Sequence, residues 1–81
     1  MTVRLTSGTI YLEGECLVDD AEALTRQLIR HPKAIVDWSG CQSTHTAVFQ
    51  VLLAIRPSLR GTPAGDFVAR HLAPLLASAE Q

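Results

Sequence analysis

Apolar and polar residues alternate with a period of two near the N-terminus. In Thr9–Leu12 every second residue is apolar, which is typical of a strand with one buried face. A second β-rich run, Thr2–Thr6, lies just before it, and only the turn signal Ser7-Gly8 separates the two. The pattern predicts an antiparallel hairpin. We expect its second strand to end at Glu13–Glu15, where the central glycine allows a change of direction.

The period then changes to that of a helix. Asp19 or Asp20 can cap this helix, and the sequence His31-Pro32 ends it, because a residue before proline is pushed out of the α region. The pattern predicts a helix over Asp20–Arg30. Its apolar stripe consists of Ala21, Leu24 and Leu28, extended by Leu17 or Ile29.

A short apolar run, Ala34–Trp38, predicts a buried strand that completes a βαβ unit with parallel strands. The polar stretch Gln42–Thr46 then predicts a loop, followed by a second helix over Thr46–Ile55 that Thr44 or Ser43 caps and Pro57 ends. The expected inner face of this helix carries Val48, Val51, Leu52 and Ile55.

The C-terminal part predicts a brief edge strand at Ser58–Arg60 and a third helix that opens at Thr62-Pro63. Pro74 lacks the N–H for a helical hydrogen bond, so we expect a kink or a break there. The apolar side of this helix would carry Phe67, Val68, Leu72 and Leu75. The whole pattern predicts a single α/β domain over residues 1–81, with a small mixed β-sheet, an N-terminal hairpin, a βαβ unit and helices packed on the sheet.

Composition agrees with one small globular domain. The chain has 81 residues, 47% of them hydrophobic, and a net charge of −1. Seven Lys and Arg against eight Asp and Glu give no nucleic-acid footprint and no polybasic membrane patch. The apolar runs are too short for membrane insertion, and the N-terminus lacks a signal-peptide pattern, so we expect a cytoplasmic protein. A possible homodimer is expected, because Val48, Phe49 and Leu59 cannot all face inward.

The potential metal ligands lack the spacing of a metal site, so no metal and no cofactor is expected. These ligands are Cys16, Cys41, His31, His45 and His71. The two cysteines are expected to be reduced, partly buried thiols that fill the core, since the expected compartment is reducing.

Three hydroxyl side chains, those of Ser43, Thr44 and Thr46, precede the apolar part of the second helix. The helix start offers unpaired N–H groups and the positive end of the helix dipole, so a phosphate could bind there or be attached to a hydroxyl. His45 lies next to Thr46 and could activate it, but adjacent residues project in different directions and no third group is spaced to orient the imidazole. We therefore expect no enzymatic activity.

Three segments of the chain resemble the STAS domain, the family of bacterial anti-sigma-factor antagonists and of the cytoplasmic domains of sulfate transporters. They are Leu12-Glu13-Gly14-Glu15 before the first helix, Ile35-Val36-Asp37-Trp38-Ser39-Gly40, and Thr46-Ala47 ahead of Leu52-Leu53-Ala54. The resemblance covers about Val3–Arg56. It implies a regulatory protein–protein interaction domain in signal transduction, whose partner is an anti-sigma factor or kinase-like protein or a transporter component.

In antagonists of this family, the hydroxyl residue after the loop aspartate is phosphorylated by the partner kinase, and the resemblance places that acceptor at Thr46. The family's aspartate is replaced here by His45, and its glycine and leucine by Val48-Phe49. The partner-binding residues implied are Ser43, Thr44, His45, Thr46 and Phe49. Three alternatives stay open: Thr46 as a simple helix cap, an unphosphorylated assembly module of a transport or signalling complex, and a binder of a small anion or ligand at the start of the second helix.

Overall fold

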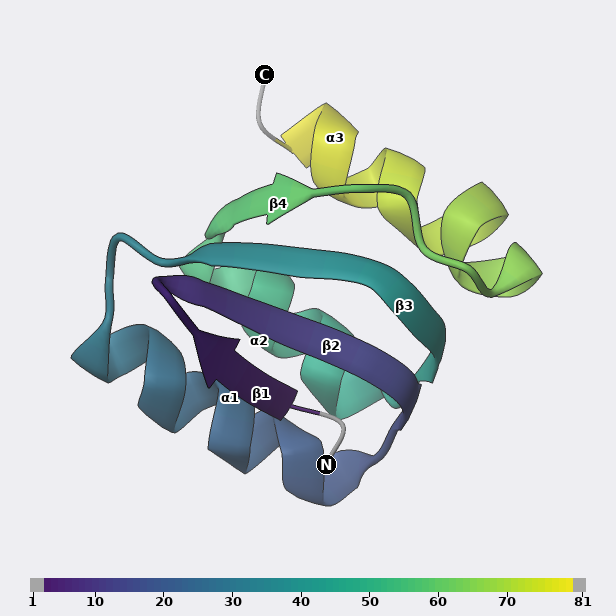
Figure 1. Cartoon of the computed structure of the whole chain (residues 1–81). Coiled ribbons are helices and arrows are strands. Elements are labelled where there is room, and N and C mark those ends of the chain that lie inside the picture. Colours follow the sequence, from purple (N-terminus) through teal and green to yellow (C-terminus); the bar gives the residue numbers. More distant parts are fainter. Residues whose placement is uncertain (1–2, 80–81) are drawn as a thin grey trace.

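The computed structural model describes the backbone of residues 3–79 and the side chains as far as residue 76. Four strands form one sheet, and helices cover it from one side (Figure 1). The elements, in chain order, are β1 Val3–Thr6, β2 Thr9–Cys16, α1 Val18–Arg30, β3 Ile35–Thr44, α2 Thr46–Ile55, β4 Ser58–Arg60, the π-helical turn η1 Val68–Leu72 and α3 Ala73–Ala79.

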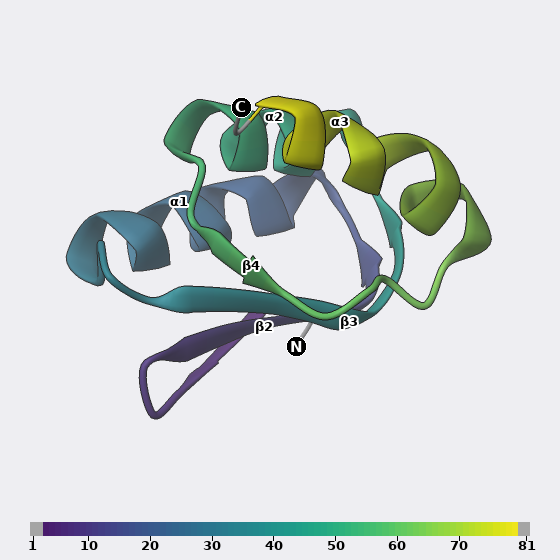
Figure 2. The same ribbon diagram turned by 90° about the horizontal axis from the view of Figure 1, so that it is seen from above.

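The sheet has the order β1-β2-β3-β4, with β1 antiparallel to β2 and the other neighbours parallel. The predicted fold class, a small mixed sheet with an N-terminal hairpin and a βαβ unit, is therefore confirmed. Figure 2 shows α1, α2 and α3 on the same side of the sheet, so that its other face stays open. Apolar side chains gather between the two layers, and the largest of them that are completely buried include Ile10, Leu12, Leu24 and Leu52.

The hairpin turns at Ser7 and Gly8, which both have positive φ, of 50° and 78°. This geometry matches the right-handed twist of the strands that it joins, as the turn signal predicted. The predicted end of β2 at Glu13–Glu15 is wrong, because the strand continues to Cys16. Gly14 has a φ of 72° and lies inside the strand, at an irregularity in the pairing with β3, rather than at its end.

The third strand is longer than the predicted Ala34–Trp38, and the predicted loop over Gln42–Thr46 is mostly strand. Two register shifts explain the difference, because at each of them β3 has one more residue than β2. The buried side chains of β3 are consequently spaced by two residues and then by three, at Val36, Trp38 and Cys41.

The first helix begins at Val18, and neither Asp19 nor Asp20 is its N-cap, because Leu17 occupies that position. The carboxylate of Asp20 accepts the backbone N–H of Leu17 at 2.7 Å from inside the first turn. Leu24 and Leu28 are buried as predicted, and Ala21 is half-buried. The predicted extension of the apolar stripe to Leu17 or Ile29 is wrong, since these side chains are 60% and 71% exposed.

The second helix matches the predicted Thr46–Ile55. Its buried residues are Val48, Phe49 and Leu52, whereas Val51 is half-buried and Ile55 is exposed, so the predicted inner face is rotated toward Phe49. The expected homodimer therefore loses its supporting argument, which was that three apolar side chains cannot all face inward. Val48 and Phe49 do face inward, and the half-buried Leu59 packs against the core.

The edge strand β4 is confirmed at Ser58–Arg60, but the last helix does not open at Thr62-Pro63. Helical backbone begins at Asp66 and passes through η1, where the N–H of Ala73 reaches back to the carbonyl of Val68. A π-turn thus takes the place of the kink or break expected at Pro74. Of the predicted apolar side, Val68 is buried and Leu72 half-buried, whereas Phe67 and Leu75 are exposed.

Candidate functional site

The residues predicted to form the site meet where β3 passes into α2. Ser43 and Thr44 are the last residues of β3, His45 is the single residue between the two elements, and Thr46 is the first residue of α2. Ser43, His45 and Thr46 are exposed, and Thr44 is half-buried. Phe49 belongs to the core and is only 8% exposed, so a partner contact through its side chain is not available in this structure.

His45 caps the second helix, a role that the sequence had suggested for Thr44 or Ser43. Its Nδ1 atom accepts the backbone N–H of Ala47 at 3.0 Å, so that nitrogen carries no proton. Its carbonyl oxygen accepts the N–H groups of Val48 and Phe49 at 3.0 Å and 3.2 Å. Thr44 and Ser43 cannot fill this position because they lie in the strand.

The cap changes what the helix start offers to an anion. The N–H groups of Ala47, Val48 and Phe49 are already bonded to His45, so they form no ready seat for a free phosphate. The helix dipole remains, and the side chain of Thr46 stays exposed in the first turn. A covalently attached phosphate would need no such seat.

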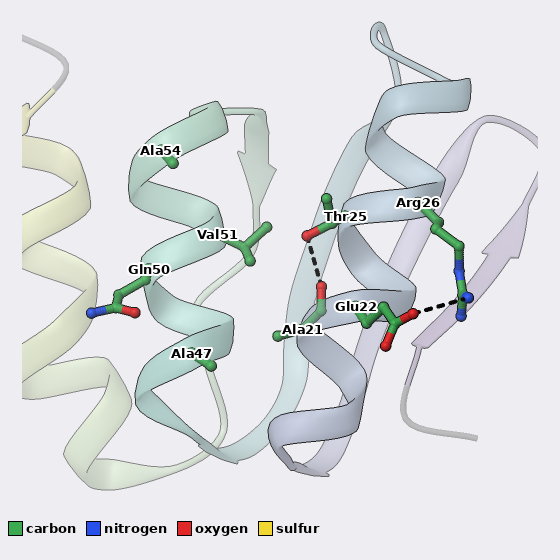
Figure 3. A pocket seen from close by; sticks show the side chains of 8 residues that line it. All are labelled: Ala21, Glu22, Thr25, Arg26, Ala47, Gln50, Val51 and Ala54. Atoms are coloured by element: carbon green, nitrogen blue, oxygen red, sulfur yellow. Dashed lines mark hydrogen bonds and ion pairs between the residues drawn. The ribbon is translucent and has the colours of Figure 1, made fainter.

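A groove of about 440 Å³ lies between α1 and α2 and begins one residue after Thr46 (Figure 3). Its floor is made by small side chains of both helices, and Gln50 and the ion pair of Glu22 with Arg26 at 3.5 Å lie along it. The lining residues are Ala21, Glu22, Thr25, Arg26, Ala47, Gln50, Val51 and Ala54. We name Ser43, His45, Thr46 and this groove the junction surface.

The groove could not be predicted from the apolar pattern of α2, because the large residues of that pattern face the core. A signal was present: Ala47, Val51 and Ala54 recur at helical spacing and are small enough to let two helices leave space between them. In α1, Ala21 has the same effect. Thr25 also lines the groove, and its hydroxyl donates to the carbonyl oxygen of Ala21 at 2.8 Å.

The junction is fastened to β2 by a backbone hydrogen bond, in which the N–H of His45 donates to the carbonyl oxygen of Cys16 at 2.7 Å. Beneath it, the thiols of Cys16 and Cys41 meet with their sulfur atoms 3.9 Å apart. Both cysteines are free and fully buried, not partly buried as expected. The thiol of Cys41 and burial together raise the pKa of Cys16, whereas the hydrogen bond from Cys16 lowers the pKa of Cys41.

The open face of the sheet carries a network of paired charges. The guanidinium of Arg4 lies 4.4 Å from the centre of the Tyr11 ring, and that of Arg60 lies 6.0 Å from it. Arg4 also pairs with Glu13 at 3.2 Å, and Arg60 pairs with Asp37 at 3.0 Å. The charges of the four ionic groups therefore balance, and the face is suited to contact with water.

Within residues 3–79, no group of three or more His, Cys, Asp or Glu side chains is placed to hold a metal ion. In the same part of the chain, no helix combines the length and the apolar character needed to cross a membrane. Comparison of the chain with models of known protein families, with curated proteins and with solved structures finds no match.

Proposed function

We propose that this chain is a regulatory protein–protein interaction domain of the STAS type, which acts in the cytoplasm and binds its partner through the junction surface. The observation that carries the proposal is the position of Thr46. Its side chain is exposed in the first turn of α2, one residue before the groove between α1 and α2. A partner segment seated in that groove would pass beside the Thr46 hydroxyl.

Phosphorylation of Thr46 by a partner kinase would then act as a switch. A phosphate adds a charge of about −1.5 to −2. At the start of a helix this charge faces the positive end of the dipole, so the domain itself tolerates it. Phosphorylation would instead weaken partner binding, because the partner would contact a bulky anion at the edge of the groove between α1 and α2.

No catalytic role is proposed for His45. A general base must accept a proton from the group that it activates. The Nδ1 atom of His45 instead accepts the Ala47 N–H, and its ring caps the helix. This arrangement supports an interaction domain over an enzyme.

An unphosphorylated assembly module of a transport or signalling complex is the second candidate. The groove favours it independently, because an apolar groove between two helices can accept a partner helix without any phosphate. A small-anion binder is less well supported, since the cap by His45 uses three N–H groups of the helix start.

The test compares partner capture from native cell extract by four baits: the unchanged chain, Thr46→Ala, Thr46→Glu and the control Ser58→Glu. Ser58 is an exposed hydroxyl residue that pairs with Ile35 at the opposite end of β3 from the junction. The same partner should be captured by the unchanged chain, Thr46→Ala and Ser58→Glu, and lost with Thr46→Glu. Mass spectrometry of the chain from its own cells should detect phosphate on Thr46.

Equal capture by all four baits, with no phosphate on Thr46, would remove the switch and leave the assembly module. A partner lost equally with Thr46→Glu and Ser58→Glu would mean that added charge alone disturbs binding, and the junction surface would lose its special role.

A further inference from the structure

Two sulfur atoms meet inside the domain although their residues lie 25 positions apart in the chain. Cys16 is the last residue of β2, and Cys41 lies in the neighbouring strand β3. Their Sγ atoms are 3.9 Å apart, and the two residues are 2% and 0% exposed. Two cysteines that only fill space in a core have no need to be in contact with each other.

We propose that Cys16 and Cys41 form an oxidisable dithiol, a modification site that a peroxide converts into an intrachain disulfide between β2 and β3. This site is separate from Thr46 and does not depend on the proposed interaction.

The backbone already holds the two cysteines in place for the bond. Gly14 pairs with Cys41 and Cys16 pairs with Thr44, so the cysteines sit diagonally on two hydrogen-bonded strands. A disulfide bond is about 2.05 Å long, and the two sulfur atoms must therefore approach by roughly 2 Å. Side-chain rotation at two residues can supply much of this movement without separating the strands.

Cys41 is suited to react first. The thiol of Cys16 can donate to the sulfur of Cys41 across the 3.9 Å contact, and this hydrogen bond lowers the pKa of Cys41. A lower pKa favours the thiolate, which is the form that attacks. Cys16 is placed to react second, because its sulfur already lies 3.9 Å from the sulfur of Cys41.

The chemistry takes two steps. The Cys41 thiolate attacks one oxygen of hydrogen peroxide, the O–O bond breaks, and the released hydroxide takes a proton and leaves as water. Cys41 becomes a sulfenic acid. The sulfur of Cys16 then attacks the sulfur of Cys41, the S–O bond breaks, and the leaving hydroxide takes the proton of Cys16 as a second water. The two thiols are oxidised by two electrons, and the peroxide is reduced to two waters.

The segment that leads from β4 to η1 packs against the backbone of β3 at Cys41. The N–H of Gly65 donates to the carbonyl oxygen of Cys41 at 2.9 Å, and Gly65 lies so close to β3 that a Cβ there would overlap the carbonyl oxygen of Gln42. Local opening of this segment is the route by which we expect a small oxidant to reach the buried sulfur.

The test uses the whole reduced chain, treated with hydrogen peroxide, then denatured and alkylated for mass spectrometry. Both thiols should be lost together, with a mass lower by two hydrogen atoms and a linked peptide pair that contains Cys16 and Cys41. Dithiothreitol should restore both thiols. The proposal is overturned if both thiols stay open to alkylation after an exposure that fully oxidises glutathione in the same tube. It is overturned equally if oxygen adds to the cysteines without a link, or if the link joins two chains.

Single variants test the order of the steps. In Cys16→Ala the reaction should stop at a sulfenic acid on Cys41, which dimedone traps, and in Cys41→Ala the thiol of Cys16 should remain reduced over the same time. A sulfenic acid on Cys16 alone would overturn the assigned order. If either variant does not fold, the linked peptide from the unchanged chain still decides whether the site exists.

Discussion

The imidazole of His45 takes the backbone N–H of Ala47 on its Nδ1 atom at 3.0 Å, so a neutral histidine ring caps α2. Serine, threonine, aspartate and asparagine are the usual residues at this position, because a short oxygen-bearing side chain reaches the same N–H groups. The STAS family, to which we propose that this chain belongs, has aspartate at the position of His45, so the variant His45→Asp tests the cap directly.

Loss of the cap should be measurable in the stability of the whole domain. We expect His45→Ala to lower the free energy of unfolding by about 1 kcal/mol, and His45→Asp to retain it or raise it, because a carboxylate also favours the positive end of the helix dipole. Urea denaturation followed by the fluorescence of the buried Trp38 measures both. His31→Ala, at an exposed position, is the control. Equal effects of His45→Ala and His31→Ala would contradict the cap.

Charge at Thr46 should affect stability according to its sign. Thr46 is the first residue of α2, where a negative charge interacts favourably with the dipole and a positive charge unfavourably. We expect Thr46→Glu to be as stable as the unchanged chain or slightly more so, and Thr46→Lys to be less stable by about 0.3–1 kcal/mol. The difference should shrink at high salt. A loss of stability in Thr46→Glu equal to that in Thr46→Lys would mean that the hydroxyl itself is needed.

The parts of the fold that follow regular rules could be predicted from the sequence. The two-residue turn at Ser7-Gly8 joins two alternating strands, and Pro57 ends a helix with clear apolar spacing, so local chemistry and tertiary structure agree there. The length of β3 could not be predicted. Its two extra residues break the alternation of buried and exposed side chains after Trp38. The polar stretch that follows therefore lacks the period of two by which a strand is predicted.

The sequence predicted that Ser43 to Thr46 lie together at the start of the second helix, and the structure places them there. The capping role of His45 could not be predicted, because it depends on the orientation of its ring, which residue type alone does not determine. The contact between Cys16 and Cys41 depends on the pairing of β2 with β3 and on the register shifts in it. The sequence pattern within each strand does not determine how two strands far apart in the chain align with each other.

The close approach of Gly65 to β3 predicts a large cost for a single methyl group. A Cβ at Gly65 would overlap the carbonyl oxygen of Gln42, and this backbone atom cannot move without disturbing the sheet. We expect Gly65→Ala to destabilise the domain by roughly 3 kcal/mol, at the upper end of overpacking effects. Thermal unfolding measures the change.

Gly14→Ala is the matched control for that experiment. Gly14 has open space around its Cα, and only its φ of 72° opposes a side chain, so the expected cost is about 1 kcal/mol. If Gly65→Ala cost no more than Gly14→Ala, the contact with the carbonyl oxygen of Gln42 would not be the obstacle inferred from the structure.

Acid should remove a stabilising contribution that Asp37 makes to the fold. The hydroxyl of Ser39 donates to Oδ1 of Asp37 at 2.6 Å and the N–H of Ser39 at 3.0 Å, and Arg60 pairs with the other carboxylate oxygen at 3.0 Å. The bonds from Ser39, followed by those from Arg60, lower the pKa of Asp37. In the unfolded chain an aspartate has a pKa of about 3.9. The carboxylate therefore stabilises the fold at every pH above that value, and the contribution is lost as the pH falls through the lower pKa of the folded state.

We accordingly expect Asp37→Asn to be less stable than the unchanged chain near neutral pH, with a difference that diminishes below about pH 4 as the carboxylate of the unchanged chain becomes protonated. Ser39→Ala removes the largest cause of the pKa shift, so its stability should fall less steeply with acid than that of the unchanged chain. Urea denaturation at a series of pH values from about 7 to about 3 measures all three proteins. The difference in stability between Asp37→Asn and the unchanged chain could instead stay constant over this pH range. The charge of Asp37 would then not stabilise the fold, and the effect of the substitution would come from packing alone.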